Sequence, residues 1–146
     1  MDVVIDDRLL LAVLLRGEPD GVTQVRRRGG LYTTGLWYHR LCRAVAGRRV
    51  VGRLSGELPG APPEAAAAVM ASIVELPPAI GLISLRDLAW PMGAMVQDHR
   101  LNVIALEALS AARRIRGAIC VDQRNAGQPL VEAAAEFGVP VVRIAA

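Results

Sequence analysis

The chain has 146 residues, of which 53% are hydrophobic, and its formal net charge is +3. This length fits one domain, residues 1–146, with a single core, and the apolar content excludes an intrinsically disordered chain. The sequence lacks an apolar stretch long enough to cross a bilayer, and around Asp2 it lacks the basic region that begins a signal peptide. We therefore expect a cytoplasmic protein that does not enter a membrane.

The first predicted elements are a strand and a helix that follow one another directly. Residues 2–5 form an apolar strand, and residues 7–16 have the spacing of a helix with one buried face. Asp6 lies between them, and two interpretations of it stay open. Asp6 caps the amino end of the helix, or it is an acid at the carboxyl end of a strand, where open parallel sheets bind ligands.

The next part of the chain predicts a further strand and two helices. Residues 22–30 have no clear period and are expected to form a mobile segment or a short strand, and residues 31–34 look extended. Threonines at the end of that strand are good caps for a helix over residues 36–46. A glycine-rich, basic connection covers residues 48–60, and a proline pair then opens an alanine-rich helix over residues 62–76.

The last part of the chain predicts three helices and three strands. In chain order these are a minor strand at 80–83, a helix from residue 85 that kinks or breaks at Pro91, a helix at 103–116 capped by Asn102, a strand at 117–122, a helix at 129–137 and a strand at 139–144. The order of the elements and the near-continuous apolar strands predict an α/β fold. Its architecture is a three-layer sandwich with a short, mostly parallel central sheet.

Arginines and aromatic residues are concentrated between residues 26 and 43. Arginine makes paired hydrogen bonds to phosphate, and exposed rings stack on unpaired bases, so this segment indicates single-stranded nucleic-acid binding. The alternative is that Trp37 packs in the core and that the arginines form a solvated or oligomer-facing surface. The candidate nucleic-acid-binding residues are Arg26, Arg27, Arg28, Arg40 and Arg43, interleaved with Tyr32, Trp37 and Tyr38.

Two stretches carry a resemblance to a known family. Val4-Ile5-Asp6 runs into an apolar helix, and Ile119-Cys120-Val121-Asp122 is followed by a helix and by Gly138-Val139-Pro140-Val141-Val142. This combination resembles the PIN domain, the fold of toxin-type ribonucleases of the VapC kind. The resemblance implies that Asp6 and Asp122 are catalytic acids that hold Mg²⁺ or Mn²⁺, which activates a water for attack on an RNA phosphodiester.

The two middle acids of the family pattern are absent from this sequence. No carboxylate occurs between residues 20 and 57, and Trp37-Tyr38-His39-Arg40 stands where the second acid should fall. The third acid should fall near residues 104–105, but the nearest carboxylate is Glu107, two or three residues late. Because a guanidinium cannot coordinate a cation and repels one nearby, we expect a PIN-like domain with a degenerate acidic site.

Two functional hypotheses remain open. The first is an active Mg²⁺- or Mn²⁺-dependent ribonuclease toxin, in which Asp7, Glu107 or a partner's residue completes the metal shell. The second is a domain with weak or lost catalysis that acts by binding nucleic acid or a protein. The resemblance also implies a small antitoxin-like partner, and the high apolar content fits a homodimer or another homo-oligomer.

Overall fold

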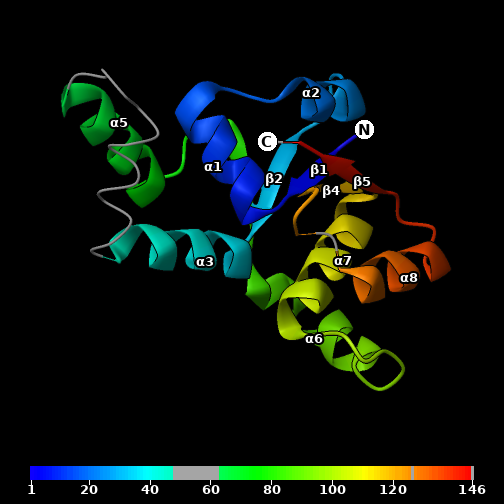
Figure 1. Ribbon diagram of the computed structural model, residues 1–146. Helices are drawn as coiled ribbons and strands as arrows, with labels where there is room; N and C mark the ends of the chain where they lie inside the picture. Colours follow the sequence, from blue (N-terminus) through cyan, green and yellow to red (C-terminus); the bar gives the residue numbers. More distant parts are fainter. Residues whose placement is uncertain (48–62, 126, 146) are drawn as a thin grey trace.

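A single parallel sheet forms the centre of the protein. The computed structural model describes residues 1–47, 63–125 and 127–145. Its strands lie in the order β3-β2-β1-β4-β5, and each neighbouring pair is parallel. Figure 1 labels β2, β1, β4 and β5 at the centre of the molecule. The strands are β1 (Val3–Ile5), β2 (Leu31–Thr34), β3 (Ile80–Ile83), β4 (Ala118–Asp122) and β5 (Val141–Ile144).

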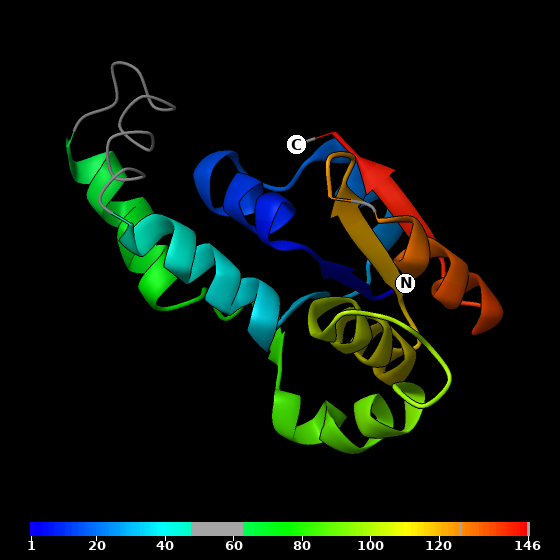
Figure 2. The ribbon, with the colours of Figure 1, turned by 60° about the horizontal axis from the view of Figure 1, so that its bottom comes forward.

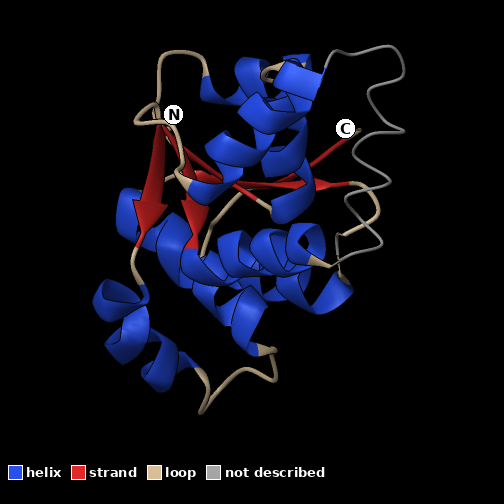
Figure 3. Ribbon diagram, turned by 90° about the vertical axis from the view of Figure 1, so that its left-hand side faces the viewer, coloured by secondary structure: helices blue, strands red, loops and turns tan. Residues whose placement is uncertain are grey.

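Helices cover both faces of this sheet, as Figures 2 and 3 show. The described helices are α1 (Asp7–Arg16), α2 (Asp20–Arg26), α3 (Gly35–Ala46), α5 (Pro63–Val74), α6 (Leu85–Met95), α7 (Val103–Ile115) and α8 (Gln128–Glu136). The predicted three-layer α/β sandwich is therefore confirmed. Within the part of the chain that the structure describes, no helix combines the length and the apolar character that a membrane span requires.

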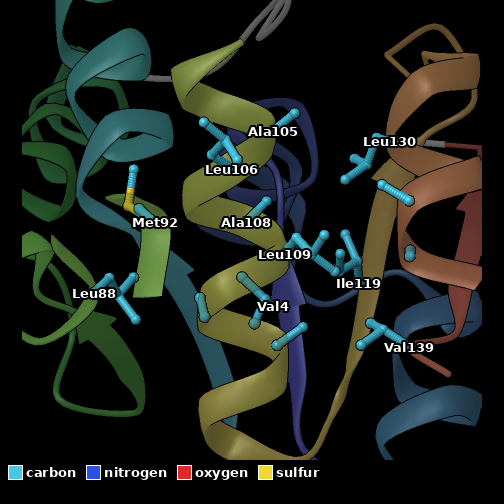
Figure 4. Close-up of a cluster of buried hydrophobic side chains, with 14 of the residues drawn as sticks. Val4, Leu88, Met92, Ala105, Leu106, Ala108, Leu109, Ile119, Leu130 and Val139 are labelled. Carbon is cyan, nitrogen blue, oxygen red and sulfur yellow. The ribbon is translucent and has the colours of Figure 1, made fainter. Parts of the chain in front are cut away.

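The alternation of side chains along the strands divides the core into two clusters. Val3 and Ile5 pack with α1, α2, α3 and α5 on one face of the sheet, whereas Val4 packs with α6, α7 and α8 on the other. Figure 4 shows Leu109 of α7 lying against the strands beside Val4 and Ile119. Because β1 and β4 are buried on both faces, their sequences are continuous apolar runs.

The helix caps follow the sequence prediction. The Thr34 hydroxyl accepts a hydrogen bond from the Trp37 N–H, and the Asn102 side chain accepts one from the Ala105 N–H. The helix α6 continues through Pro91 to Met95, so the predicted interruption does not end it. The connection predicted at 48–60 lies outside the described residues.

The prediction for residues 22–30 is wrong, because residues 20–26 form the helix α2. Pro19 precedes the helix in an extended conformation, and Val22 inside it has no exposed surface. Val25, one turn later, packs against the same core cluster. A helix of seven residues is too short to show a helical period in the sequence, and burial against the sheet stabilises it.

Gly117 is required by a close approach of two chain segments. A Cβ at this position would lie 2.3 Å from the Asp2 carbonyl oxygen. We expect Gly117→Ala to lower the free energy of unfolding by about 2 kcal/mol or more, because backbone must move to relieve the overlap. Gly93→Ala is the matched control, since Gly93 lies within α6 with nothing within 4 Å. It should raise stability by about 0.5 kcal/mol. Urea denaturation measures both, and equal stabilities would contradict the prediction.

Candidate functional site

The candidate site lies where the strand order of the sheet reverses. The chain moves outward from β1 through β2 to β3 and then crosses to β4 on the other side of β1. In open parallel sheets, ligands bind outside the carboxyl ends of the strands at such a reversal. Asp6 follows β1 directly, and Asp122 is the last residue of β4. The two predicted acids therefore lie on adjacent strands at the same edge, and the Asp122 N–H donates to Asp6 Oδ2 over 2.9 Å.

Asp6 has no exposed surface and holds several elements together. Its Oδ1 accepts a hydrogen bond of 2.9 Å from the Leu9 N–H, which caps α1. Its Oδ2 accepts from the Asp122 N–H and, over 2.7 Å, from Asn125 Nδ2. Burial raises the pKa of Asp6, although these hydrogen bonds oppose the shift. The capping interpretation of Asp6 is thus confirmed, and the residue also lies at the carboxyl end of a strand.

Asp7 is paired with a cation from the same chain. The Arg40 guanidinium, carried by α3, donates through Nε to Asp7 Oδ2 over 2.7 Å and through Nη2 to Asp7 Oδ1. This hydrogen-bonded pair raises the pKa of Arg40. Asn125 Nδ2 also donates to Asp7 Oδ1 over 3.1 Å, so that one amide joins the Asp6 and Asp7 carboxylates. A two-pronged Arg–carboxylate pair is strong and fixed in direction.

Asp122 is paired with Arg124, which lies two residues later in the chain. The backbone N–H of Arg124 donates to Asp122 Oδ1 over 2.9 Å, and the guanidinium donates to the same carboxylate through Nε and Nη2. Asp122 is fully buried, whereas 59% of the Arg124 side chain is exposed. The arginine therefore covers the acid from the solvent side.

Glu107 acts as a cap for a neighbouring helix. Its Oε2 accepts a hydrogen bond of 2.8 Å from the Leu36 N–H in the first turn of α3, and the whole residue is buried. A carboxylate is favourable at the amino end of a helix, because the N–H groups there carry partial positive charge. Glu107 thus fixes α3 against α7, and that placement positions Arg40.

These residues do not fit a divalent metal. Mg²⁺ and Mn²⁺ require several oxygen ligands, and a guanidinium that occupies those oxygens repels the metal ion. Here every carboxylate oxygen of Asp6 and Asp7 already accepts an N–H, and the Arg40 guanidinium lies on Asp7. Among the described residues, no group of three or more His, Cys, Asp or Glu side chains is arranged to hold a metal ion. The Arg40 guanidinium on Asp7 therefore opposes a metal shell made by Asp7 with Asp6 and Asp122.

The predicted basic segment does not form one surface. Arg26, Arg27 and Arg28 precede β2 at the amino edge of the sheet, whereas Arg40 and Arg43 follow the carboxyl end of β2 on α3. The aromatic residues between them are not exposed rings: Trp37 is 3% exposed, and the Tyr38 hydroxyl donates to the Ile73 carbonyl. The core interpretation of Trp37 is confirmed. Only the arginines of α3 remain candidates at the site edge.

Arg26 stabilises the fold through an ion pair, and the stability of a variant measured at several pH values tests this role. It pairs with Glu18 over 2.6 Å and donates to the Gly29 carbonyl. The Arg26 hydrogen bond lowers the pKa of Glu18, so the stabilisation is complete above the ordinary Glu value of 4.5 and is lost as the pH falls through the lowered pKa. We expect Arg26→Ala to lower the free energy of unfolding by about 1 kcal/mol at pH 7 and by less in acid. Arg28→Ala serves as the control, because Arg28 is exposed. A loss of stability in Arg26→Ala that is equal at all pH values would contradict the role of the Arg26–Glu18 pair.

A cavity opens beside these acids at the carboxyl edge. Its volume is about 370 Å³, and it lies between α3, the amino ends of α7 and α8, and the end of β4. Its polar lining comes from Arg40, Arg100, Asn102 and Asn125. Of these four residues, the sequence pattern predicts only Arg40 as a ligand-binding residue. Arg100 and Asn125 each precede a helix, but nothing in the local sequence indicates that both face one cavity.

Comparisons with known proteins supply no identity for this chain. Neither the protein-family profiles nor the curated proteins include a match to it.

Proposed function

We propose that this chain is a PIN-like domain that binds single-stranded RNA at the carboxyl edge of its sheet and does not cleave it by metal-dependent catalysis. One observation carries the proposal. Arg40 and Asn125 donate to the Asp6 and Asp7 carboxylates, at the place where the resemblance implies a divalent metal. A fixed guanidinium keeps this edge attractive to phosphate while it blocks cation binding.

The topology of the sheet supports the proposed PIN-like fold. The sheet order 3-2-1-4-5 brings the acids after β1 and β4 together, which is what the resemblance needs. Because other doubly wound sheets have the same strand order, the order alone does not distinguish a PIN-like domain from them. The acids at the ends of β1 and β4 are the feature that favours the PIN-like domain. The antitoxin-like partner and the homo-oligomer stay predictions of the sequence.

The positive charge of the cavity lining supports the proposed RNA binding. The cavity lining contains two arginines and no acidic residue among the described residues. No described residue accepts a hydrogen bond from the Arg100 side chain, so its guanidinium is available to a phosphate. Arg43, one turn after Arg40 on α3, is exposed and extends the positive charge beyond the cavity.

Binding and cleavage are separated by one pair of assays. Fluorescence anisotropy with a labelled mixed-sequence RNA in EDTA should give saturable binding that weakens with salt. Arg100→Gln should weaken it and lower the salt slope by about one phosphate contact, whereas the exposed Arg86→Gln, at the start of α6, should not. The same RNA incubated with millimolar Mn²⁺ should remain intact.

The active-ribonuclease alternative gives the opposite result. It requires cleavage that depends on Mn²⁺ or Mg²⁺ and disappears in Asp122→Asn. Cleavage of that kind would disprove the loss of catalysis, and the absence of RNA binding in EDTA would disprove the binding function.

A further inference from the structure

The cavity at the carboxyl edge has the size and lining of a small-molecule site. Its volume of about 370 Å³ falls within the range of ligand pockets. Most of its lining is apolar, with Trp37, Leu101, Val121 and Leu130 among the residues that form it. An RNA backbone bound across a flat surface would not need such a hollow with apolar walls. The cavity therefore suits a ligand with an apolar body.

The polar groups of the cavity are already oriented by the fold. Asn102 Oδ1 caps α7, which leaves its Nδ2 as a donor without a partner among the described residues. Asn125 Nδ2 is held by the Asp6 and Asp7 carboxylates, which leaves its carbonyl oxygen as an acceptor. Arg40 uses Nε and Nη2 on Asp7, and its Nη1 has no acceptor among the described residues. The cavity thus offers three donors, two of them charged, and one acceptor.

This combination selects a particular chemistry. Two guanidinium groups and one amide N–H suit a phosphate, and no carboxylate among the described lining residues opposes it. The amino end of α8 also borders the cavity at Gly127, where no side chain caps the first turn. The Asn125 oxygen suits a ribose hydroxyl or a base amine, and the apolar walls suit a base.

We infer that the cavity binds a nucleoside monophosphate group, with the phosphate at Arg40 and Arg100 and the nucleoside against the apolar wall. This inference rests on the proposed function, because it names the part of an RNA that this edge recognises. The group has two sources, a free mononucleotide and the 5′-phosphorylated end of a strand. In both cases Arg40 replaces a metal as the cation between Asp7 and the phosphate, so binding is expected in EDTA.

Trp37 is a reporter for this cavity. The sequence has two tryptophans, and Trp90 is 87% exposed on α6, whereas Trp37 lines the cavity. In a Trp90→Phe background, the fluorescence of Trp37 is titrated in EDTA with UMP, AMP, uridine and inorganic phosphate. We expect both nucleotides to bind at least about tenfold more tightly than phosphate or uridine. Phosphate that binds as tightly as the nucleotides would overturn the inference.

Two variants test the named contacts without removing folding interactions. Arg100→Gln removes an exposed guanidinium and should weaken nucleotide binding by about tenfold or more. Asn102→Asp keeps the oxygen that caps α7 but places a carboxylate in the cavity, so binding should be lost while the melting temperature is retained. Arg86→Gln is the matched control outside the cavity and should bind normally. Unchanged binding in both cavity variants would overturn the inference.

Oligonucleotides distinguish the two sources and separate this inference from the proposed function. Tighter binding of a 5′-phosphorylated RNA than of its 5′-hydroxyl form supports the strand end, and equal binding of the two beside tight UMP binding supports the free nucleotide. RNA binding without any nucleotide binding would overturn the inference and leave the proposed function standing. Nucleotide binding without any RNA binding would overturn the proposed function and leave the inference about the cavity standing.

Discussion

Asp6→Ala is expected to lower the free energy of unfolding by about 3 kcal/mol or more. The substitution leaves the N–H groups of Leu9 and Asp122 without their acceptor, and the Asn125 amide keeps only its hydrogen bond to Asp7. Each buried donor without a partner costs about 1 to 3 kcal/mol, and relief of the desolvated charge on Asp6 offsets part of the sum. In a domain of this length the loss corresponds to a fall in melting temperature of roughly 10 °C.

Urea denaturation followed by circular dichroism measures this effect. Asp87→Ala is the matched control, because Asp87 is also in the first turn of a helix but is exposed and lies 3.9 Å from Arg114. That control should change stability by less than about 0.5 kcal/mol. Losses of equal size in the two variants would contradict the structural role of Asp6. The expected loss also means that inactivity of an Asp6 variant is not by itself evidence of metal ligation.

Arg40→Glu is expected to create a metal site at Asp7. The arginine reaches both oxygens of Asp7, and glutamate is shorter, so a cation fits between a carboxylate at position 40 and Asp7. In EDTA the variant should lose about 2 kcal/mol or more, because the ion pair is replaced by repulsion between carboxylates. Mn²⁺ at a hundredfold excess over Kd should restore about 2.7 kcal/mol.

The measurement is the melting temperature with and without millimolar Mn²⁺. Arg40→Gln has the length of glutamate without its charge, so it should lose stability in EDTA but show no recovery with metal. The natural chain should respond to Mn²⁺ by less than about 0.5 kcal/mol. A large Mn²⁺ response in the natural chain would show that Arg40 does not block the site. The absence of a response in Arg40→Glu would show that Asp6 and Asp7 are misplaced for metal binding.

Together, the two substitutions separate what the acids do for the fold from what they do at the edge. Asp6 belongs to the hydrogen bonds that join β1, β4 and α1, so its removal acts on stability. The residue at position 40 determines whether the carboxyl edge of the sheet offers a ligand a positive or a negative side chain. We expect the edge to attract phosphate in a chain with Arg40 and a cation in a chain with glutamate at that position.

Most of the fold follows from local patterns in the sequence. The strand before Asp6 and the helix after Asn102 carry their signals within a few residues, as apolar runs and capping side chains. The helix at 20–26 was missed because it is short and owes its stability to the burial of Val22. Local propensity does not report burial against a distant strand.

By itself, the sequence determined the α/β class, the placement of Asp6 and Asp122 at the ends of strands, and the absence of a carboxylate at position 40. Only the tertiary structure decided what those acids touch. Arg40 meets Asp7 across 33 residues, Glu107 meets Leu36 across 71, and Asn125 meets Asp6 across 119. Such contacts depend on strand register and on how helices dock against the sheet. A periodic pattern specifies which face of an element is buried, but it does not specify the polar partner that the buried face will find.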